Sequence, residues 1–266
     1  MLPRERTIRM GVSAIIVAKN EVADIAACLG SVSWAEERRV VDTGSRDATR
    51  QVAAAAGARV LEYAWLGYGA TKNWAFAQAG CDWILSLDAD EHVSEELAAE
   101  IQAVTATPET RDPRPETPPP VAYEMPRRFH FQGRWLKHGG CYPDWQLRLF
   151  RRGSAAYGED LIHERLQVDG AVGRLKGHLD HFSYATQAEA VQKLDEYSGL
   201  WAQQAHAGGR RSRWYHPLSL ATGFAGRYVL KAGFLDGRAG MEWAVLAARH
   251  SRLKYAKLAE LERARG

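Results

Sequence analysis

The sequence predicts an α/β fold in which helices cover both faces of a mostly parallel sheet. In the first hundred residues, short apolar runs alternate with helix-like segments, and the connections between them are short. Two of the helix-like segments end at glycines, Gly57 and Gly80, which is typical of helix C-termini. Alternating strands and helices favour a parallel sheet, whose ligands bind beyond the C-terminal ends of the strands.

Four strands and four helices are expected in this part of the chain. Apolar composition predicts strands over 13–18, 39–42, 58–63 and 83–88. Helices are expected over 22–29, 45–57, 70–80 and 94–104, with Ser45 and Ser94 as N-caps of the second and fourth. This order places three loops, 19–21, 42–45 and 88–91, at one edge of the sheet.

The remainder of the chain divides into three parts. Residues 105–120 hold six of the ten prolines and are expected to form a flexible connector. Residues 121–184 are rich in aromatic and β-forming types, which predicts further strands, some of them antiparallel. A helix is expected over 187–206, followed by a basic tail. We therefore predict a main domain over 11–184 and a C-terminal helical region over 185–266.

Composition excludes several classes of protein. The 46% hydrophobic and 25% charged content is ordinary for a soluble globular chain, and three scattered cysteines predict no disulfide framework. The N-terminus lacks the pattern of a signal peptide. The longest uncharged run, 214–226, has 13 residues, fewer than the roughly 18 expected of a spanning helix. We expect a cytoplasmic protein that does not cross a membrane.

Three carboxylates, Asp88, Asp90 and Glu91, directly follow the apolar strand at 83–88. Like charges this close repel one another, so they favour either an open acidic loop or a site for a cation. An Asp-x-Asp pair at a ligand-binding edge suits Mg²⁺ or Mn²⁺ bridged to a diphosphate. Taken alone, the pattern leaves both interpretations open.

Other polar residues at the same edge are candidates for binding a nucleotide. Asp42 could accept hydrogen bonds from a base or a ribose, and Lys72, in the first turn of its helix, could contact a diphosphate. Lys19 and Glu21 follow the first strand. For each of them a plain loop, a helix cap or a solvated charge is the alternative.

The combination of these motifs resembles glycosyltransferase family 2. It consists of KNE (19–21), VVDTGSRDAT (40–49), ATKN (70–73) and LDADE (87–91), in this order. The resemblance covers most of 11–184 and implies a GT-A fold, a Rossmann-like mixed sheet that binds a nucleotide-diphosphate sugar. It also implies that Lys19, Glu21 and Asp42 lie at the nucleotide, that Asp88 lies near ribose or metal, and that Asp90 ligates Mg²⁺ or Mn²⁺.

The general base is harder to assign, because the later half departs from the commonest family pattern. The segment YGEDLIHERL (157–166) offers His163-Glu164, which resembles the base motif of a bacterial subgroup of the family. We predict Glu164 as the base, then Asp160, then Asp144 of YPDWQLRLFRR (142–152). In GT-A enzymes a late histidine sometimes completes the metal site. His181 is the candidate here, with a structural histidine as the alternative.

The basic tail predicts a contact with an anionic membrane surface. Residues 206–258 hold ten Lys or Arg and two acids, and they mix aromatic and aliphatic residues. A helical pair packed on the sheet, with solvated charges, is the alternative. A nucleic-acid partner is not expected, since no zinc motif or recognition-helix pattern is present.

The tail also carries a second resemblance. YVLKAGFLDGRAG (228–240) and RLKYAKL (252–258) are similar to the end of lipopolysaccharide inner-core glycosyltransferases, of the type that adds β-linked glucose to a core heptose. This implies a lipid-linked acceptor and a peripheral location on the cytoplasmic face of the inner membrane.

Together the motifs predict an inverting, metal-dependent transferase that moves a hexose, with glucose first, from a UDP-sugar to a lipopolysaccharide inner-core acceptor. One alternative keeps this chemistry with a protein or polyprenyl-phosphate acceptor. Another is a nucleotide-sugar-binding protein without catalysis. A sugar-phosphate nucleotidyltransferase is disfavoured, because AKNE (18–21) stands where its glycine-rich loop belongs.

Overall fold

The computed structural model describes residues 9–106, 118–158, 166–184, 186–213 and 215–264, and the chain forms two compact units. The N-terminal unit comprises the chain up to residue 127 together with 145–180. The C-terminal unit comprises 128–144 together with 181–266. The C-terminal unit thus takes in 128–144 besides the helical region that we expected from 185. The proline-rich segment lies mostly outside the described residues, at 107–117.

The expected alternation of strands and helices in the first hundred residues is confirmed. The strands are β1 (Arg9–Ala18), β2 (Glu37–Asp42), β3 (Arg59–Glu62) and β4 (Cys81–Asp88). The helices are α1 (Ile25–Ser31), α2 (Thr49–Ala55), α3 (Tyr68–Ala77) and α4 (Glu95–Ala106). Strand β1 begins four residues earlier than expected, and α2 begins four residues later.

The late start of α2 shows that Ser45 is not its N-cap, contrary to the prediction. Ala48 stands at the cap position and makes no side-chain capping bond. The Ser45 hydroxyl instead accepts a hydrogen bond from the backbone N–H of Asn20, at 2.9 Å. A serine after a strand can bond to any nearby backbone donor, so a tertiary partner replaced the local one here.

The later strands extend the sheet as expected, and partly in the antiparallel sense. They are β5 (Glu91–Val93), β6 (Ala122–Phe131), β7 (Arg134–Leu136), β8 (Asp144–Arg151), β9 (Ala155–Tyr157), β10 (Leu166–Val168), β11 (Val172–Arg174) and β12 (Leu179–Tyr184). The main sheet has the order β3-β2-β1-β4-β8-β6-β12-β5, while β9 and β10 form a separate pair. Strand β1 runs parallel to β2 and β4, whereas β8 runs antiparallel to β4.

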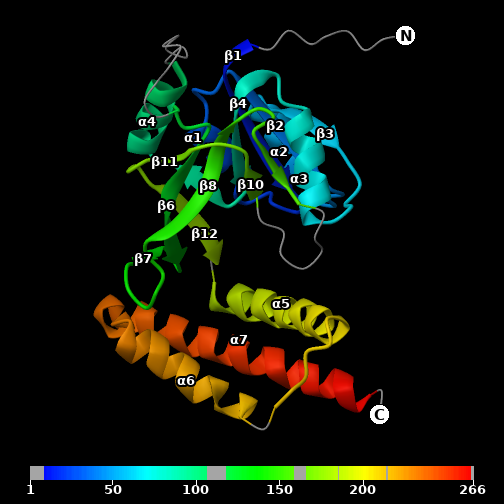
Figure 1. Cartoon of the computed structure of the whole chain (residues 1–266), viewed down its shortest axis with the longest axis vertical. Helices are drawn as coiled ribbons and strands as arrows, with labels where there is room; N and C mark the ends of the chain where they lie inside the picture. The colour runs from blue at the N-terminus through cyan, green and yellow to red at the C-terminus, as the bar shows by residue number, and fades with distance from the viewer. Residues whose placement is uncertain (1–8, 107–117, 159–165, 185, 214, 265–266) are drawn as a thin grey trace. The chain divides into compact units, whose positions relative to one another are not determined.

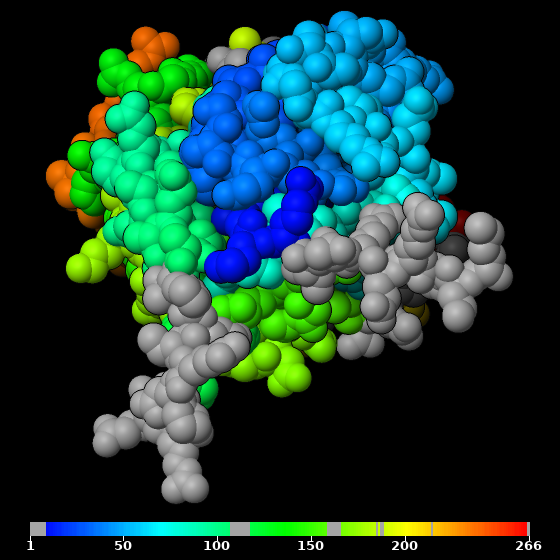
Figure 2. Space-filling model, turned by 90° about the horizontal axis from the view of Figure 1, so that it is seen from above, coloured from blue at the N-terminus to red at the C-terminus, as the bar shows by residue number. Residues whose placement is uncertain are grey.

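Helices cover both faces of the sheet because successive side chains of a strand point to opposite faces. On β1, Ile16 belongs to a core that includes Leu29 of α1 and Leu97 of α4. Its neighbour Ile15 belongs to a second core with Phe76 of α3. In the space-filling view, α4 (green) lies beside the blue segment that contains the start of β1 (Figure 2).

The C-terminal unit is mainly helical, as expected. It contains α5 (Gln187–Ala207), α6 (Ser219–Ala225) and α7 (Gly237–Arg263), with short helical turns η1 (His216–Leu218), η2 (Gly226–Leu230) and η3 (Gly233–Asp236). Helix α7 packs against both α5 and α6 (Figure 1). Among the helices of the described residues, none is long and apolar enough to span a membrane.

Acid sensitivity is predicted for a carboxylate at the start of β2. Glu37 accepts hydrogen bonds from the Ser13 hydroxyl at 2.7 Å and the Gly80 N–H at 2.8 Å, and it pairs with Arg39. Burial acts to raise the pKa of Glu37, but the hydrogen bonds from Arg39, Ser13 and Gly80 outweigh it and lower the pKa from 4.5 to about 2. The stabilisation is therefore complete above pH 4.5 and is lost as the pH falls towards 2.

We expect Glu37→Gln to lower the free energy of unfolding by about 2 kcal/mol at pH 7, a value reduced for partial solvent screening. Urea denaturation at pH 7 and at pH 3 measures the difference, which should shrink at the lower pH. Glu62→Gln is the matched control, since that side chain is 74% exposed on the neighbouring strand. A difference between Glu37→Gln and the native protein that does not vary with pH would contradict the assignment.

Candidate active site

Strand register brings the predicted loops to one edge of the sheet. In the parallel ladders on the two sides of β1, Ala18 pairs with Asp42 of β2 and Val17 pairs with Asp88 of β4. Neighbouring strands lie about 4.8 Å apart, so Asp42 and Asp88 stand roughly 10 Å apart, with the end of β1 between them. The predicted convergence of these loops at the C-terminal edge is confirmed.

Hydrogen bonds join the loop after β1 to the loop after β2. The Asn20 side-chain oxygen accepts from the Arg46 N–H at 2.8 Å, and the Thr49 hydroxyl accepts from the Glu21 N–H at 2.8 Å. Asn20 has a φ of 58°, a left-handed conformation that asparagine tolerates better than most residues. The Lys19 side chain is exposed and Glu21 is half-buried at this edge.

Asp42 holds the turn that follows its own strand. Its side chain is buried, and its carboxylate accepts the backbone N–H groups of Gly44 and Ser45, each at 3.1 Å. The Arg50 guanidinium approaches the same carboxylate at 3.4 Å. The Ser45 N–H also lies 3.3 Å from the second carboxylate oxygen, so both oxygens of Asp42 stabilise the loop, and its contact with a base or ribose stays a prediction.

The carboxylates at the end of β4 are neutralised largely by cations of the chain itself. Lys72 of α3 donates to one oxygen of Asp88 at 2.7 Å, and Arg148 of β8 donates to the other at 2.7 Å. Arg148 also donates to Glu91 at 2.7 Å, and Arg127 contacts that same carboxylate at 3.2 Å. Asp88, Glu91, Lys72, Arg148 and Arg127 thus form one ion-pair network, called the acidic-edge network below.

The network changes the interpretation of Lys72. We predicted a lysine in the first turn of its helix that faces a diphosphate or the solvent. Helix α3 instead begins at Tyr68, four residues before Lys72, and the Lys72 side chain is only 2% exposed, with its ammonium on Asp88. The Tyr68 ring adds a cation–π contact, 5.1 Å from the ammonium to the ring centroid. In this structure Lys72 orients Asp88.

Arg148 and Arg127 are the residues of this site that the sequence analysis missed. A signal was present for Arg148, which stands within the apolar alternation of LRLF (147–150). A buried arginine in a strand needs a carboxylate partner, and the predicted cluster of acids at 88–91 offered such carboxylates. The pairing itself depends on the antiparallel contact of β8 with β4, where Leu149 is opposite Leu85.

The charges of the acidic-edge network shift the pKa values of groups in and around it. Burial would by itself lower the pKa of Arg148, but the carboxylates of Asp88 and Glu91 raise it well above its usual value. Burial raises the pKa of the Cys28 thiol, and the negative charges of Glu91, Asp90 and Asp88 raise it further. The carboxylates of this edge therefore favour the charged form of Arg148 and disfavour a thiolate at Cys28.

The donor chemistry of this edge fits a divalent cation that is held mainly through Asp90. Asp90 is half-buried in the turn between β4 and β5, and carboxylate oxygens are the ligands that Mg²⁺ and Mn²⁺ prefer. In the part of the chain that the structure describes, no three His, Cys, Asp or Glu residues form a metal-binding group. Mg²⁺ usually binds one or two carboxylates plus substrate phosphates, and this edge has the donors for that arrangement.

The predicted trio of Asp88, Asp90 and His181 is accordingly not a ready-made metal site in the described structure. Both oxygens of Asp88 already have cationic partners. His181 belongs to the C-terminal unit, where its Nε2 lies 2.6 Å from the Ser183 hydroxyl. A role for Asp90 in metal binding stays a prediction.

Two of the three candidate bases, Asp160 and Glu164, lie outside the described residues. The strands that flank their segment are well anchored: Tyr157 of β9 pairs with Leu166 of β10. Asn73 of α3 donates to the Tyr157 carbonyl at 2.9 Å and accepts the Tyr157 N–H at 2.8 Å. The described residues on either side of that segment, Tyr157 and Leu166, are thus paired, and Tyr157 is bonded to α3, the helix that carries Lys72.

The third candidate base, Asp144, is the first residue of β8 and is half-buried. It belongs to the C-terminal unit, together with the segment 128–143 that precedes it. Its role as a base stays a prediction, as do those of Glu164 and Asp160.

Comparison with known proteins decides the family. A family model described as "Glycosyl transferase family 2" matches residues 13–155, which include Asp42, the acidic-edge network and β8. The chain belongs to glycosyltransferase family 2. This family 2 glycosyltransferase has the predicted GT-A architecture, with a mixed α/β sheet followed by C-terminal helices.

Relatives match this family 2 glycosyltransferase over nearly its whole length. It is 27% identical to the lipopolysaccharide core biosynthesis glycosyltransferase LpsC of Rhizobium meliloti, over 90% of this chain and 91% of LpsC. It is 28% identical to the uncharacterized glycosyltransferase RT0209 of Rickettsia typhi, over 94% of this chain and 87% of that protein. Among solved structures, it is similar to glucosyl-3-phosphoglycerate synthase from Mycobacterium tuberculosis with a TM-score of 0.44, at 18% identity over 64% of this chain and 70% of that one.

Proposed function

We propose that this glycosyltransferase is an inverting enzyme that moves a hexose, glucose first, from a UDP-sugar to a lipopolysaccharide inner-core acceptor. The convergence of Asp42 and Asp88 at one sheet edge, with Asp90 two residues beyond β4, carries the proposal, because carboxylates gathered at such an edge suit a nucleotide and a divalent cation. The acceptor class is supported by the similarity to LpsC, a lipopolysaccharide core biosynthesis glycosyltransferase, along 90% of the chain.

The donor would lie along the C-terminal edge of the sheet. Lys19, Glu21 and Asp42 would contact the nucleoside. Asp90 would hold Mg²⁺ or Mn²⁺, and Asp88 would contribute to the same site. A divalent cation bound there neutralises charge on the diphosphate. Lys72 acts through Asp88, since the ion pair between them fixes the carboxylate in one orientation.

The transfer is a single displacement. Glu164 takes the proton from the acceptor hydroxyl while the oxygen of that hydroxyl forms a bond to the anomeric carbon. The bond between that carbon and the diphosphate oxygen breaks on the opposite face, and UDP leaves with the electron pair. A single displacement inverts the configuration at the anomeric carbon.

Replacing the base tests this step. We expect Glu164→Gln to lower kcat by about 10²–10⁴-fold, because a positioned base contributes that much, and to leave the Kd of UDP unchanged. Steady-state kinetics and calorimetry give the two quantities. Asp160→Asn and Asp144→Asn are the matched controls, and a larger loss in either of them would move the base assignment to that residue.

The function as a whole is tested by a donor screen with truncated core lipopolysaccharide as the acceptor. We expect transfer from UDP-glucose, a requirement for Mg²⁺ or Mn²⁺, and a β-linkage in the product by NMR. Transfer to a polyprenyl phosphate or a protein, but not to the core, would replace the acceptor. Binding of UDP-glucose without transfer or hydrolysis would favour the non-catalytic alternative.

The location belongs to the same proposal. A lipid-linked acceptor places the enzyme at a membrane, and we propose a peripheral position on the cytoplasmic face of the inner membrane. Residues 206–258 contain ten Lys or Arg and two acids, and this positive charge supports contact with anionic lipid.

A further inference from the structure

Large apolar side chains are exposed in one short stretch of the C-terminal unit. In the segment 229–235, called the apolar segment below, Leu230 is 84% exposed, Leu235 60%, Val229 57% and Phe234 49%. Two more exposed leucines precede it, Leu218 at the end of η1 and Leu220 in α6. Exposed apolar side chains gathered in this way indicate a surface that binds something, whereas isolated ones do not.

Neighbouring residues of the same unit hold the apolar segment in place. The Gly139 N–H donates to the Lys231 carbonyl at 2.8 Å, and the carbonyl of Gly139 accepts from Arg227 at 3.4 Å. The backbone N–H of His138 and its ring Nδ1 each lie 2.8 Å from the carboxylate of Asp236. The exposure therefore belongs to an ordered turn that is tied at both of its ends.

Close backbone packing inside this turn requires glycine. A Cβ at Gly233 would lie 2.7 Å from the Arg227 carbonyl oxygen, and one at Gly240 would lie 2.0 Å from the Gly233 carbonyl oxygen. The chain thus folds tightly on itself and still presents its leucines and phenylalanine outward. Exposed apolar side chains do not stabilise such a turn in water, so we expect a partner to cover them.

The charges around the apolar segment suit an anionic partner. Lys231 is exposed and Arg227 is half-buried, and neither forms an ion pair with an acid in the described part of the chain. The one acid within 226–241 is Asp236, whose side chain is 8% exposed and is occupied by His138. Apolar side chains flanked by Lys and Arg that make no ion pair within the described residues are typical of surfaces that enter the interface of an anionic bilayer.

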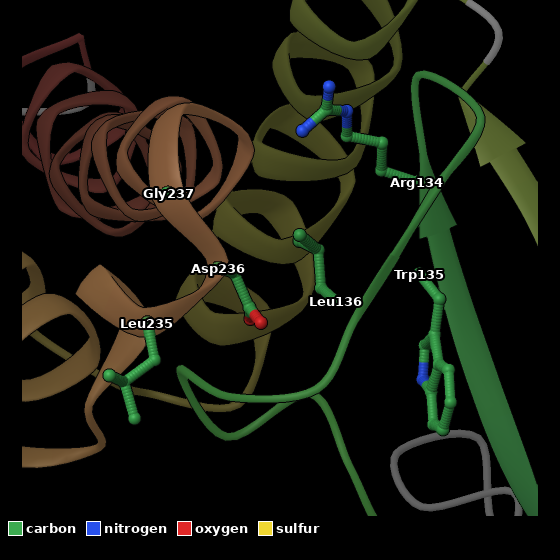
Figure 3. A pocket seen from close by; sticks show the side chains of 6 residues that line it. All are labelled: Arg134, Trp135, Leu136, Leu235, Asp236 and Gly237. Carbon is green, nitrogen blue, oxygen red and sulfur yellow. The ribbon is translucent and has the colours of Figure 1, made fainter.

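A hollow of about 500 Å³ adjoins the segment. Figure 3 shows Leu235, Asp236 and Gly237 on its helical side, and Arg134, Trp135 and Leu136 on the side of β7. The Lys137 ammonium lies 4.5 Å from the centroid of the Trp135 ring. Arg134 in the hollow and Lys137 close to it in the chain add positive charge beside the apolar segment.

We propose that residues 229–235 insert into the interface of an anionic phospholipid bilayer, with Arg227 and Lys231 at the level of the lipid phosphates. A second copy of the chain is the less suitable occupant, because a symmetric contact would set these charges against their own copies. The proposal names the lipid-contacting residues and rests on the proposed function, because the lipid-linked acceptor is the reason for the enzyme to approach a membrane. Lipid binding can nevertheless be measured without any sugar transfer.

Co-sedimentation of the full chain with vesicles tests the proposal. We expect binding to phosphatidylcholine vesicles that contain phosphatidylglycerol, weaker binding to phosphatidylcholine alone, and a decrease with salt. Leu230→Glu and Leu235→Glu should each lower the partition coefficient by about tenfold or more, and Lys231→Gln by about fivefold. Met10→Glu is the matched control, since Met10 is 66% exposed in the N-terminal unit, and it should bind like the native chain.

Three results would overturn the proposal: no binding by the native chain, equal binding by the Leu230→Glu/Leu235→Glu variant, or a lipid-free dimer that this variant loses. Circular dichroism and Tm establish that each variant is folded, and Leu230→Ser serves if the glutamates unfold the turn. Transfer to a deacylated core oligosaccharide measures the proposed function separately. An inactive enzyme that still binds vesicles would refute the proposed function but not the proposed lipid-binding surface.

Discussion

Replacing Arg148 by methionine should lower the free energy of unfolding by about 3–5 kcal/mol, because it leaves the buried Glu91 carboxylate without its nearest cationic partner. The Arg148 guanidinium lies 2.7 Å from Asp88 and 2.7 Å from Glu91. The side chain of Glu91 has no exposure to water, so solvent cannot take over the lost interaction. Urea denaturation at pH 7 measures the loss.

Two companion variants separate electrostatics from packing. Arg127→Met removes the longer contact with Glu91, 3.2 Å, from a side chain that is 21% exposed, and it should cost about 1 kcal/mol. Glu91→Gln combined with Arg148→Met should recover part of the loss, since it removes the uncompensated charge. If Arg148→Met were as stable as the native protein, the network would not support this edge of the sheet.

Asp90→Asn should abolish most of the gain in UDP affinity that Mg²⁺ or Mn²⁺ confers, a change of about 10–100-fold in Kd. Asparagine keeps the size of the side chain and removes the negative charge, so the turn between β4 and β5 should persist. Asp90 differs from Asp88 in this test, because Asp88 already has Lys72 and Arg148 as partners and its loss would also disturb the fold.

Calorimetry of UDP binding, with metal and with chelator, reads this effect without sugar transfer. Glu62→Gln on β3 is the control, and it should show the same metal dependence as the native enzyme. Two outcomes contradict the assignment. UDP affinity in the native enzyme that is unchanged by chelator would remove the metal, and a metal effect retained in Asp90→Asn would move its ligand elsewhere.

The sheet and its binding edge were predictable because their signals are local. Each of the first four strands contains adjacent apolar residues, and Gly57 follows shortly after α2, so the alternation could be read in windows of a few residues. Parallel order then placed the ends of β1, β2 and β4 together, and the register of Asp42 and Asp88 beside β1 confirms it. The family motifs lie at these same strand ends.

Side-chain partners were not predictable in this way. Lys72 was expected to face solvent or phosphate because its helix position was visible and Asp88, sixteen residues later, was not known to be in reach. Ser45 was expected to cap α2, but a backbone donor at Asn20 competes for its hydroxyl. Both outcomes depend on which strands adjoin, which is a property of the whole sheet.

By itself, the sequence determined the α/β class, the family and the sheet edge where the carboxylates gather, since apolar periodicity and motif order act over short distances along the chain. Only the tertiary structure decided how those carboxylates are neutralised. Arg148 arrives from β8, sixty residues beyond Asp88, and takes its place through an antiparallel pairing that no local pattern encodes. The strength of an ion pair depends on distance and burial, and both exist only once the strands have come together.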